Sequence, residues 1–546
     1  MIEHELKKPN FLKGAAILAA ASIIVKIIGA FYRIPLFNIL DAPGRGAFQV
    51  TYSVFGLILA ISTSGIPAAL SRLVSSAKAK GNIALVKRYK SVALPAFLII
   101  GIVSMLVMFF FADALSSLLG NSLATPGIIV LAPAAFFACI IAVYRGYAQG
   151  HENMIPTAMS QIVEVTSKLV IGIAVALWFT NMNYRTNIVS AGAITGVTIG
   201  LGLCVPLLIW YNRRIDRLLP SAPDNNEVPD KLRVFARIMK VSIPISLSAS
   251  FMAAMGLIDS AIVLNRLQSA LGYSEVEASS LWGIHALGLS LFTLPPALVV
   301  PVSVSIIPAI AAALAKKHDN EAGVIMQSSF KLVNLIAMPA GVGLMILASP
   351  ILIALYHSQL QVDYTLQLAT TILVTLGAAS FFVCLQFITT AILQANGYER
   401  VALLTFPVGA AIRFIIAYIL SGIPAFGILG SSISTLICFV IISILNIVFI
   451  KTRIKQMPKF SKVFFKPLLC SAGMALASLL TYIGVSLLGY GFLGTGRLAT
   501  VLYLAAAILV GIFIYIVLII AVRVINKEDL TYFPKGDKLA KILRVR

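Results

Sequence analysis

Charged residues are scarce in this chain. Asp, Glu, Lys and Arg make up 11% of its 546 residues, whereas hydrophobic residues make up 59%. Soluble domains carry about 25% charged residues because their surfaces face water. The longest polar stretch, at 212–237, is a linker by composition and is too short to be a domain. The low charge therefore excludes a soluble globular protein.

Residues that bind metals or perform catalysis are also few. The five cysteines and five histidines are scattered, and no Cys-x-x-Cys pair, His-Glu-x-x-His motif, phosphate-binding loop or nucleophile elbow occurs. We predict buried, unpaired cysteines, no metal site, no cofactor and no catalytic residue, hence no enzyme. Without a nucleotide site, any energy-requiring step would be driven by Na+ or H+ coupling, by the membrane potential, or by consumption of a product.

Long hydrophobic runs dominate what remains. Many exceed the roughly 20 apolar residues that cross a bilayer. Backbone polar groups in the bilayer must pair internally, so these runs predict helices. The expected fold is an all-α integral membrane protein with about 14 transmembrane helices. The expected spans are 12–40, 46–75, 91–119, 123–149, 154–180, 187–211, 238–271, 280–314, 328–356, 364–396, 401–420, 425–450, 463–490 and 498–524.

The formal net charge of +22 comes largely from loops on one side of this map. Lys and Arg concentrate in cytoplasmic loops of membrane proteins. The pattern alternates along all spans, so it predicts a multi-pass protein of the cytoplasmic membrane with both termini in the cytoplasm. It is a topology signal and does not indicate nucleic-acid binding.

The two halves of the chain resemble each other. Ile66–Ala68 in the second span matches Ile307–Ala309 in the eighth, and the Gln149–Glu152 turn matches Asn396–Glu399, in the same order and at similar offsets. A parallel repeat of six helices predicts two lobes around a cleft, the architecture of an alternating-access transporter. The predicted divisions are an N-lobe at 1–211, a cytoplasmic linker at 212–237, a C-lobe at 238–452, two further helices at 453–527 and a basic cytoplasmic tail at 528–546.

Four charged residues lie at equivalent positions of the first and seventh spans. Lys26 and Arg33 are seven residues apart, as are Asp259 and Arg266, so each pair occupies one helical face. Charges are costly in a bilayer and usually face a polar interior. We predict that these four line a cationic, substrate-binding cavity suited to an anion, because arginine grips phosphate oxygens with two parallel hydrogen bonds. Snorkelling of the arginines to the outer interface is the alternative.

For other charged residues within the spans we predict a secondary role. Glu164 and Lys168 are four residues apart and Arg413 lies at the equivalent span of the second half. They serve either ion coupling or, for the first two, mutual pairing on one helix face. Arg72 is near a span end, where anchoring at the interface competes with function, and Arg145 is interpreted as a topology signal.

Helix breakers and serines occur in the inner spans. Ser62–Pro67 interrupts the second span, and Ser242, Ser246, Ser248 and Ser250 form a polar stripe in the seventh. Broken helices are tolerated where they line a cavity, and ordinary packing is the alternative.

Two stretches carry a family resemblance. Gly29–Pro35 resembles the first helix of MurJ-type lipid II flippases, and Gly44–Asn82 resembles the second span of the polysaccharide-transport branch of the multidrug/oligosaccharidyl-lipid/polysaccharide (MOP) exporter superfamily, near the stage V sporulation protein B group. The resemblance implies 14 helices and export of an undecaprenyl-diphosphate-linked sugar, either peptidoglycan lipid II or a related precursor. Arg33 matches the cavity arginine of the first helix, whereas residues 52–61 lack the arginine of the flippase pattern.

The resemblance also implies partners. These are a lipid-linked oligosaccharide substrate, membrane lipids and cell-wall synthesis machinery, for a protein acting as a monomer in vegetative growth or sporulation. A cation-coupled multidrug exporter of the same superfamily is the alternative function. It requires acids in the cavity, and the candidates are Asp259 and Glu164.

Overall fold

The computed structural model describes most of the chain. The described residues are 21, 24–25, 28–29, 31–219, 229–357, 360, 362–454, 460–494, 496–522 and 524. The chain packs as two compact units, residues 1–283 and 284–546. All regular structure in the described part is helical.

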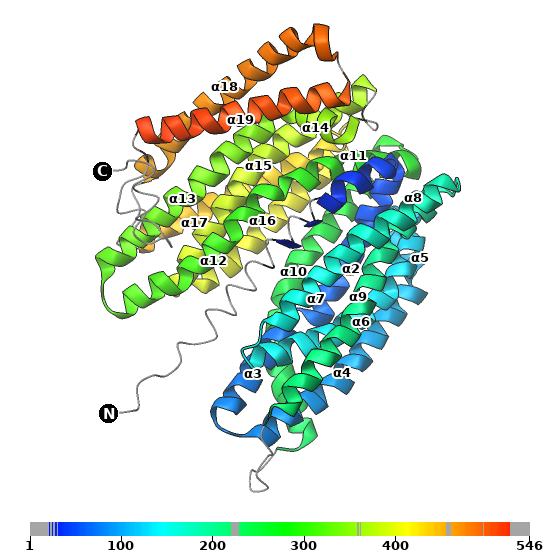
Figure 1. Ribbon diagram of the computed structural model, residues 1–546, viewed down its shortest axis with the longest axis vertical. Helices are drawn as coiled ribbons and strands as arrows, with labels where there is room; N and C mark the ends of the chain where they lie inside the picture. The colour runs from blue at the N-terminus through cyan, green and yellow to red at the C-terminus, as the bar shows by residue number, and fades with distance from the viewer. Residues whose placement is uncertain are drawn as a thin grey trace. The chain divides into compact units, whose positions relative to one another are not determined.

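The first unit consists of long, closely packed helices. Figure 1 shows α4, α6 and α9 side by side, and α6 packs against both α4 and α9. Residues 31–39 are also helical and precede the helices with assigned bounds. These are α2 (Ala42–Thr63), α3 (Gly65–Ala79), α4 (Ile83–Phe110), α5 (Ala112–Leu118), η1 (Ser122–Ala124), α6 (Thr125–Gly150), α7 (Ile155–Ser167), η2 (Lys168–Gly172), α8 (Ile173–Asn181), α9 (Thr186–Arg217), α10 (Lys231–Leu271) and the start of α11 (Glu275–Phe292).

Within its described residues, the second unit holds the rest of α11 and eight further helices. α15 packs against α12, α13 and α17, while α18 and α19 form a pair that contacts α13 and α14. The bounds are α12 (Leu294–Ala315), α13 (Asp319–Ile346), α14 (Ala348–Tyr356), α15 (Asp363–Ala395), α16 (Glu399–Leu420), α17 (Leu429–Arg453), α18 (Phe460–Leu493) and α19 (Arg497–Ala521).

The helical membrane fold is confirmed. Within the described residues, 12 helices are long and apolar enough to cross a membrane. Two expected spans are not among the 12. The expected span at 12–40 lies largely outside the described residues, and the one at 238–271 falls within α10, a continuous helix of 41 residues.

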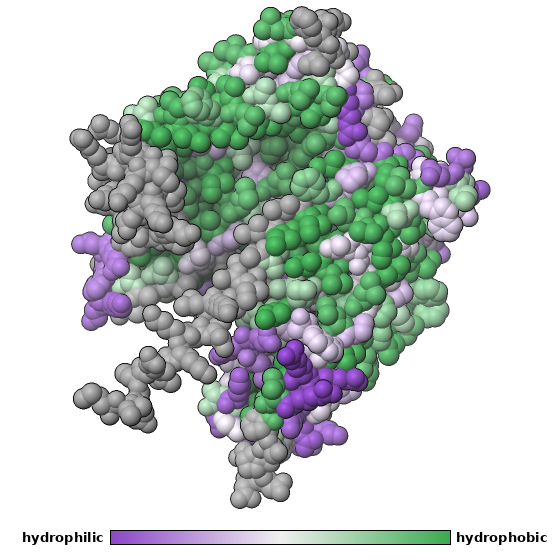
Figure 2. Space-filling model, in the orientation of Figure 1, coloured by the Kyte–Doolittle hydropathy of each residue, from purple (hydrophilic) through white to green (hydrophobic). Residues whose placement is uncertain are grey.

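The flanks of the helices are apolar. Figure 2 shows hydrophobic residues over these flanks and hydrophilic residues near the helix ends. On α4, Ile99, Val103 and Phe110 are more than half exposed, as are Leu509 and Phe513 on α19. Such side chains would be unfavourable in water but suit acyl chains, so these surfaces face lipid.

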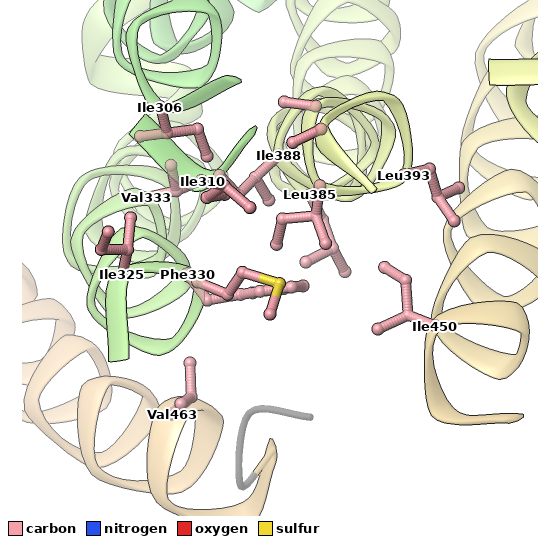
Figure 3. Packing of buried hydrophobic residues seen from close by; sticks show 14 of the residues in the cluster. Ile306, Ile310, Ile325, Phe330, Val333, Leu385, Ile388, Leu393, Ile450 and Val463 are labelled. Atoms are coloured by element: carbon pink, nitrogen blue, oxygen red, sulfur yellow. The ribbon is translucent and has the colours of Figure 1, made fainter. Parts of the chain in front are cut away.

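Each unit is held together by its own apolar core. In the second unit, residues of α12, α13, α15, α17 and α18 converge, as Figure 3 shows for Ile310, Phe330, Ile388, Ile450 and Val463. The five cysteines are all buried and none of them forms a disulfide, as predicted for packing residues.

The second span is interrupted where the sequence predicts a break. α2 ends at Thr63 and α3 begins at Gly65. Pro67 has no N–H to donate to the Thr63 carbonyl, which disrupts the helical ladder. At the same break, the N–H of Gly65 donates to the Ser246 hydroxyl of α10 at 3.0 Å. A neighbouring helix thus binds the backbone directly at the break.

The two packing units do not coincide with the predicted lobes. α10, predicted as the first helix of the C-lobe, packs against α2, α3 and α4 within the first unit. Helix also occupies both ends of the predicted linker, because α9 continues to Arg217 and α10 begins at Lys231. The predicted lobes are based on the internal sequence repeat rather than on packing, and they remain a prediction. The predicted basic tail at 528–546 lies outside the described residues.

Candidate functional site

A partly buried ion triad joins α6, α7 and η2 in the first unit. Glu164 accepts from the Lys168 Nζ at 3.0 Å through one carboxylate oxygen and from Arg145 at 3.3 Å through the other. The Arg145 Nε also donates to the Ser160 hydroxyl at 2.8 Å. One carboxylate therefore serves two cations, leaving a positive excess.

The turn between the two helices explains this juxtaposition. α6 ends at Gly150 and α7 begins at Ile155, so the helices are antiparallel neighbours joined by a short turn. Residues at similar distances from such a turn lie side by side, which places Arg145 next to Ser160 and within reach of Glu164. The sequence-based interpretation of Arg145 as a topology signal missed this contact. The signal for this contact is that Arg145 and Ser160 lie at nearly equal distances along the chain from the turn.

Lys168 lies at the middle of its span. The span runs from Ile155 to Asn181, with thirteen residues on either side of Lys168. At about 1.5 Å per residue, the ammonium-bearing residue is about 20 Å from either end. A lysine side chain cannot snorkel over that distance, so Lys168 must be stabilised inside the protein.

A π-helical turn begins at Lys168. Residues Lys168–Gly172 form η2 between α7 and α8, and such single turns often occur at functional sites. Gly172 of the turn and Gly196 of α9 permit close packing between the two: a Cβ on Gly196 would lie 2.5 Å from the Gly172 nitrogen, and one on Gly172 would lie 2.6 Å from the Ala193 carbonyl oxygen. Any side chain at either position would displace the turn.

Polar side chains from two more helices approach the triad. The Tyr32 hydroxyl donates to the Ala193 carbonyl at 3.3 Å and lies within hydrogen-bonding reach of the Tyr52 hydroxyl. Tyr52 of α2 in turn lies within electrostatic range of Lys168, Glu164 and Arg33. Arg33, Tyr52, Arg145, Glu164 and Lys168, which come from four spans, are called the N-unit polar cluster below.

Of the residues predicted from sequence, the structure pairs Glu164 with Lys168, whereas Arg33 is related to them only through its effect on Tyr52. Lys26 lies outside the described residues. Arg72 is exposed at the middle of α3, and its anchoring role stays a prediction. Arg413 belongs to the second unit, where it acts electrostatically on the buried His285.

Asp259 and Arg266 both lie on α10. The helix is continuous between them, so the two residues share a face, as predicted. Asp259 is 3% exposed and Arg266 is partly exposed. That these residues and Arg33 face one cavity between two lobes remains a prediction.

The serine stripe of the seventh span lines a groove. Ser242, Ser246 and Ser250 recur every four residues of α10 and, with Ser62, supply the hydroxyls of a groove of about 490 Å³ between α10, α4 and the α2–α3 break. The Ser250 hydroxyl donates to the Ser246 carbonyl at 2.6 Å. The groove carries no charged side chain and suits helix packing at the break.

Uncharged groups form a second buried network in the other unit. The Asn446 amide donates to the hydroxyls of Thr389 and Thr390 and accepts from Thr405, linking α15, α16 and α17. The Gln386 amide also donates to Thr390. These amide and hydroxyl groups hydrogen-bond to one another, and none of them is a carboxylate. We therefore interpret the network as one that holds the three helices together.

An apolar groove of about 510 Å³ runs between α12–α14 and the α18–α19 pair. Its walls include Leu298, Ile336, Leu344, Met474 and Ile512. Among the described residues, the polar side chains that line it are Ser478 and Tyr515, and the Tyr515 hydroxyl donates to the Leu335 carbonyl at 2.9 Å. The groove is suited to a hydrocarbon chain.

Comparisons with known proteins agree on a class. The fold resembles that of the structure titled "Lipid II flippase MurJ, inward closed conformation", with a TM-score of 0.64, 15% identity and coverage of 92% of this chain and 98% of that one. An inward-facing multidrug resistance MATE family transporter gives a TM-score of 0.62 at 16% identity, covering 80% and 98%. These proteins belong to the MOP superfamily, so the fold is that of a MOP-type membrane transporter.

The family follows from sequence. A model described as "Polysaccharide biosynthesis protein" matches residues 11–314, more than half of the chain, so the chain belongs to this family. Relatives in Bacillus subtilis (strain 168) include the uncharacterized membrane protein YabM, 26% identical over 99% of this chain and 98% of the relative, and stage V sporulation protein B, 23% identical over 97% and 98%. Lipid II flippase MurJ is 22% identical over 74% and 76%. The expected superfamily is confirmed, and the chain is a multi-pass transporter rather than an enzyme.

Proposed function

We propose that this protein flips an undecaprenyl-diphosphate-linked sugar intermediate from the inner to the outer leaflet of the cytoplasmic membrane. The substrate is peptidoglycan lipid II or a related polysaccharide precursor. Such a molecule has a long isoprenoid tail and an anionic diphosphate, and the protein must accept both within the membrane.

The observation that carries this proposal is the apolar groove beside α18 and α19. Burying hydrocarbon contributes about 0.8 kcal/mol per CH2 group. A groove of about 510 Å³ lined by aliphatic side chains from five helices therefore favours a lipid tail over a compact, polar solute.

The N-unit polar cluster suits the anionic part of the substrate. It combines Arg33, Arg145 and Lys168 with one carboxylate, Glu164, giving a formal charge of +2. A diphosphate that links a lipid to a sugar carries two negative charges, so the charges match.

The relatives support the same reading. One is named a lipid II flippase, and the structural match to a lipid II flippase extends over 92% of this chain, against 80% for the MATE transporter described above. We propose that Arg33, Arg266, Lys26 and Asp259 line the transport cavity, that the two repeats rock around it, and that both termini are cytoplasmic. The protein works as a monomer alongside cell-wall synthesis enzymes.

A cation-coupled multidrug exporter is the second candidate, because MATE transporters share the fold. Export of cationic drugs needs unpaired acids in the cavity. In the first unit, Glu164 is already bound by two cations, which favours the lipid-linked anion.

Depletion of the protein in its host tests the proposal. We expect an undecaprenyl-linked intermediate to accumulate on the inner leaflet, measured by lipid extraction and mass spectrometry together with leaflet-selective labelling. Sensitivity to cationic drugs without such accumulation would instead establish the second candidate.

A further inference from the structure

Lys168 has hydrogen-bonding capacity that the protein does not use. Its ammonium group carries three donors. Among the described residues its one hydrogen-bond partner is Glu164, at 3.0 Å. The side chain is 20% exposed, so open space adjoins it at the middle of the span. Two donors therefore remain for a ligand.

The partner of Lys168 is itself shared. Glu164 receives Arg145 on its other oxygen, at 3.3 Å, and Arg145 is further fixed by the Ser160 hydroxyl. If Lys168 left, Glu164 would still be paired with Arg145. Departure of Lys168 therefore costs less than breaking an isolated buried pair, which leaves an uncompensated charge.

The backbone around Lys168 also allows such a movement. Lys168 lies at the start of the π-helical turn. Its ammonium group is joined to this turn only by the flexible lysine side chain. Arg145, in contrast, lies within the regular helix α6 and is held by two partners. Of the two cations paired with Glu164, Lys168 is therefore the one that can leave the carboxylate to bind a ligand.

We propose that Lys168 binds the diphosphate of the substrate and that Glu164 is the carboxylate that it leaves to do so. In the empty protein Glu164 neutralises Lys168, and when an anion arrives Lys168 turns toward it, while Arg145 retains Glu164. This inference rests on the proposed function and specifies which side chains hold the anion. Glu164 then sets the affinity: it competes with the diphosphate and promotes its release.

The test is binding to the full-length protein in nanodiscs, measured by native mass spectrometry. Three probes distinguish the sources of phosphate: undecaprenyl diphosphate, inorganic diphosphate and phosphatidylglycerol. We expect undecaprenyl diphosphate to bind most tightly, because it alone combines the diphosphate with the isoprenoid tail.

Two substitutions should act in opposite directions. Lys168→Met weakens undecaprenyl diphosphate binding by about tenfold to a hundredfold, the effect of losing one charge-assisted contact. Glu164→Gln strengthens it by about threefold to tenfold, because the competing carboxylate is gone. Lys168→Arg retains binding within about threefold of wild type and serves if the methionine variant does not fold.

The matched control is the substitution of a lysine outside the N-unit polar cluster. Lys90, near the start of α4, pairs with Asp216, near the end of α9, at 2.5 Å in the same unit. Lys90→Met should leave binding of undecaprenyl diphosphate unchanged, although it removes an ion pair of the same kind.

The outcomes separate the two proposals. If wild type binds undecaprenyl diphosphate but Glu164→Gln and Lys168→Met both weaken it or both leave it unchanged, the pair is only structural and this inference is wrong. If wild type binds no probe, or prefers phosphatidylglycerol, the proposed function fails together with it.

Discussion

The N–H of Gly65 and the hydroxyl of Ser246 form a 3.0 Å hydrogen bond between the α2–α3 break and α10. The contact is close because Gly65 has no side chain. A Cβ at this position would lie 2.1 Å from the Ser242 carbonyl oxygen. α10 is therefore held directly against the interrupted helix.

Gly65→Ala should push α10 away from α3. Overpacking of this kind costs about 1–3 kcal/mol, and we expect a lower unfolding temperature of the purified protein in detergent. Gly56→Ala in α2 is the matched control, because a Cβ there meets nothing within 4 Å. Equal unfolding temperatures for the two variants would show that the close contact contributes nothing.

Gly196→Ala should displace the π-helical turn that carries Lys168. The added methyl group would meet the Gly172 backbone, whereas at Gly202 the nearest atom would be 3.5 Å away, at ordinary contact distance. We expect Gly196→Ala to reduce undecaprenyl diphosphate binding by about tenfold and Gly202→Ala to leave it unchanged. Unaltered binding in the first variant would show that the turn does not position the lysine.

Much of this architecture is predictable from sequence because membrane helices are specified locally. An apolar run long enough to span the bilayer has few alternatives to a helix, so the spans and the break at Ser62–Pro67 follow directly. Pairing of Glu164 with Lys168 follows from their spacing of four residues on one helix.

The remaining features depend on packing between helices. Arg145 joins Glu164 across a turn, and the π-helical turn at Lys168 depends on the glycines of α9, so neither has a signal within its own segment. The groove beside α18 and α19 likewise arises between helices far apart in sequence. Hydropathy gives each helix a depth in the membrane but not its neighbours.

Filling the apolar groove should block transport of a long-chain substrate. Gly343 lines the groove, and a Cβ there would have no neighbour closer than 4.0 Å, so Gly343→Phe adds a ring without a backbone clash. We expect transport to fall at least about tenfold. Gly484→Phe, on α18 with no neighbour within 4 Å, is the control and should remain active. Equal activity of the two variants would exclude the groove as the tail site.

Stability should fall in mild acid because of His151. Burial lowers the pKa of its imidazole, and nearby Lys78 and Lys90 act in the same direction, against the Tyr147 carbonyl and Asp216. The unfolded chain, with a histidine pKa of about 6.5, therefore takes up the proton first. The contribution of His151 is present above about pH 6.5 and is lost as the pH falls through that value toward the lower folded pKa.

His151→Gln should therefore flatten the pH dependence of the unfolding temperature between about pH 7.5 and 5.5. The glutamine amide keeps a donor for the Tyr147 carbonyl, which the His151 Nδ1 approaches at 2.9 Å. A slope identical to that of wild type would show that His151 does not contribute.

The central claim is that cationic side chains inside the membrane bind a lipid-linked diphosphate and carry it across. Translocation of a fluorescent undecaprenyl-diphosphate-linked sugar in proteoliposomes, read by quenching of the probe in the outer leaflet, tests it most directly. Wild type should move the probe, and Arg33→Ala and Arg266→Ala should each reduce the rate at least about tenfold without affecting insertion. Full activity of the double variant would contradict the account.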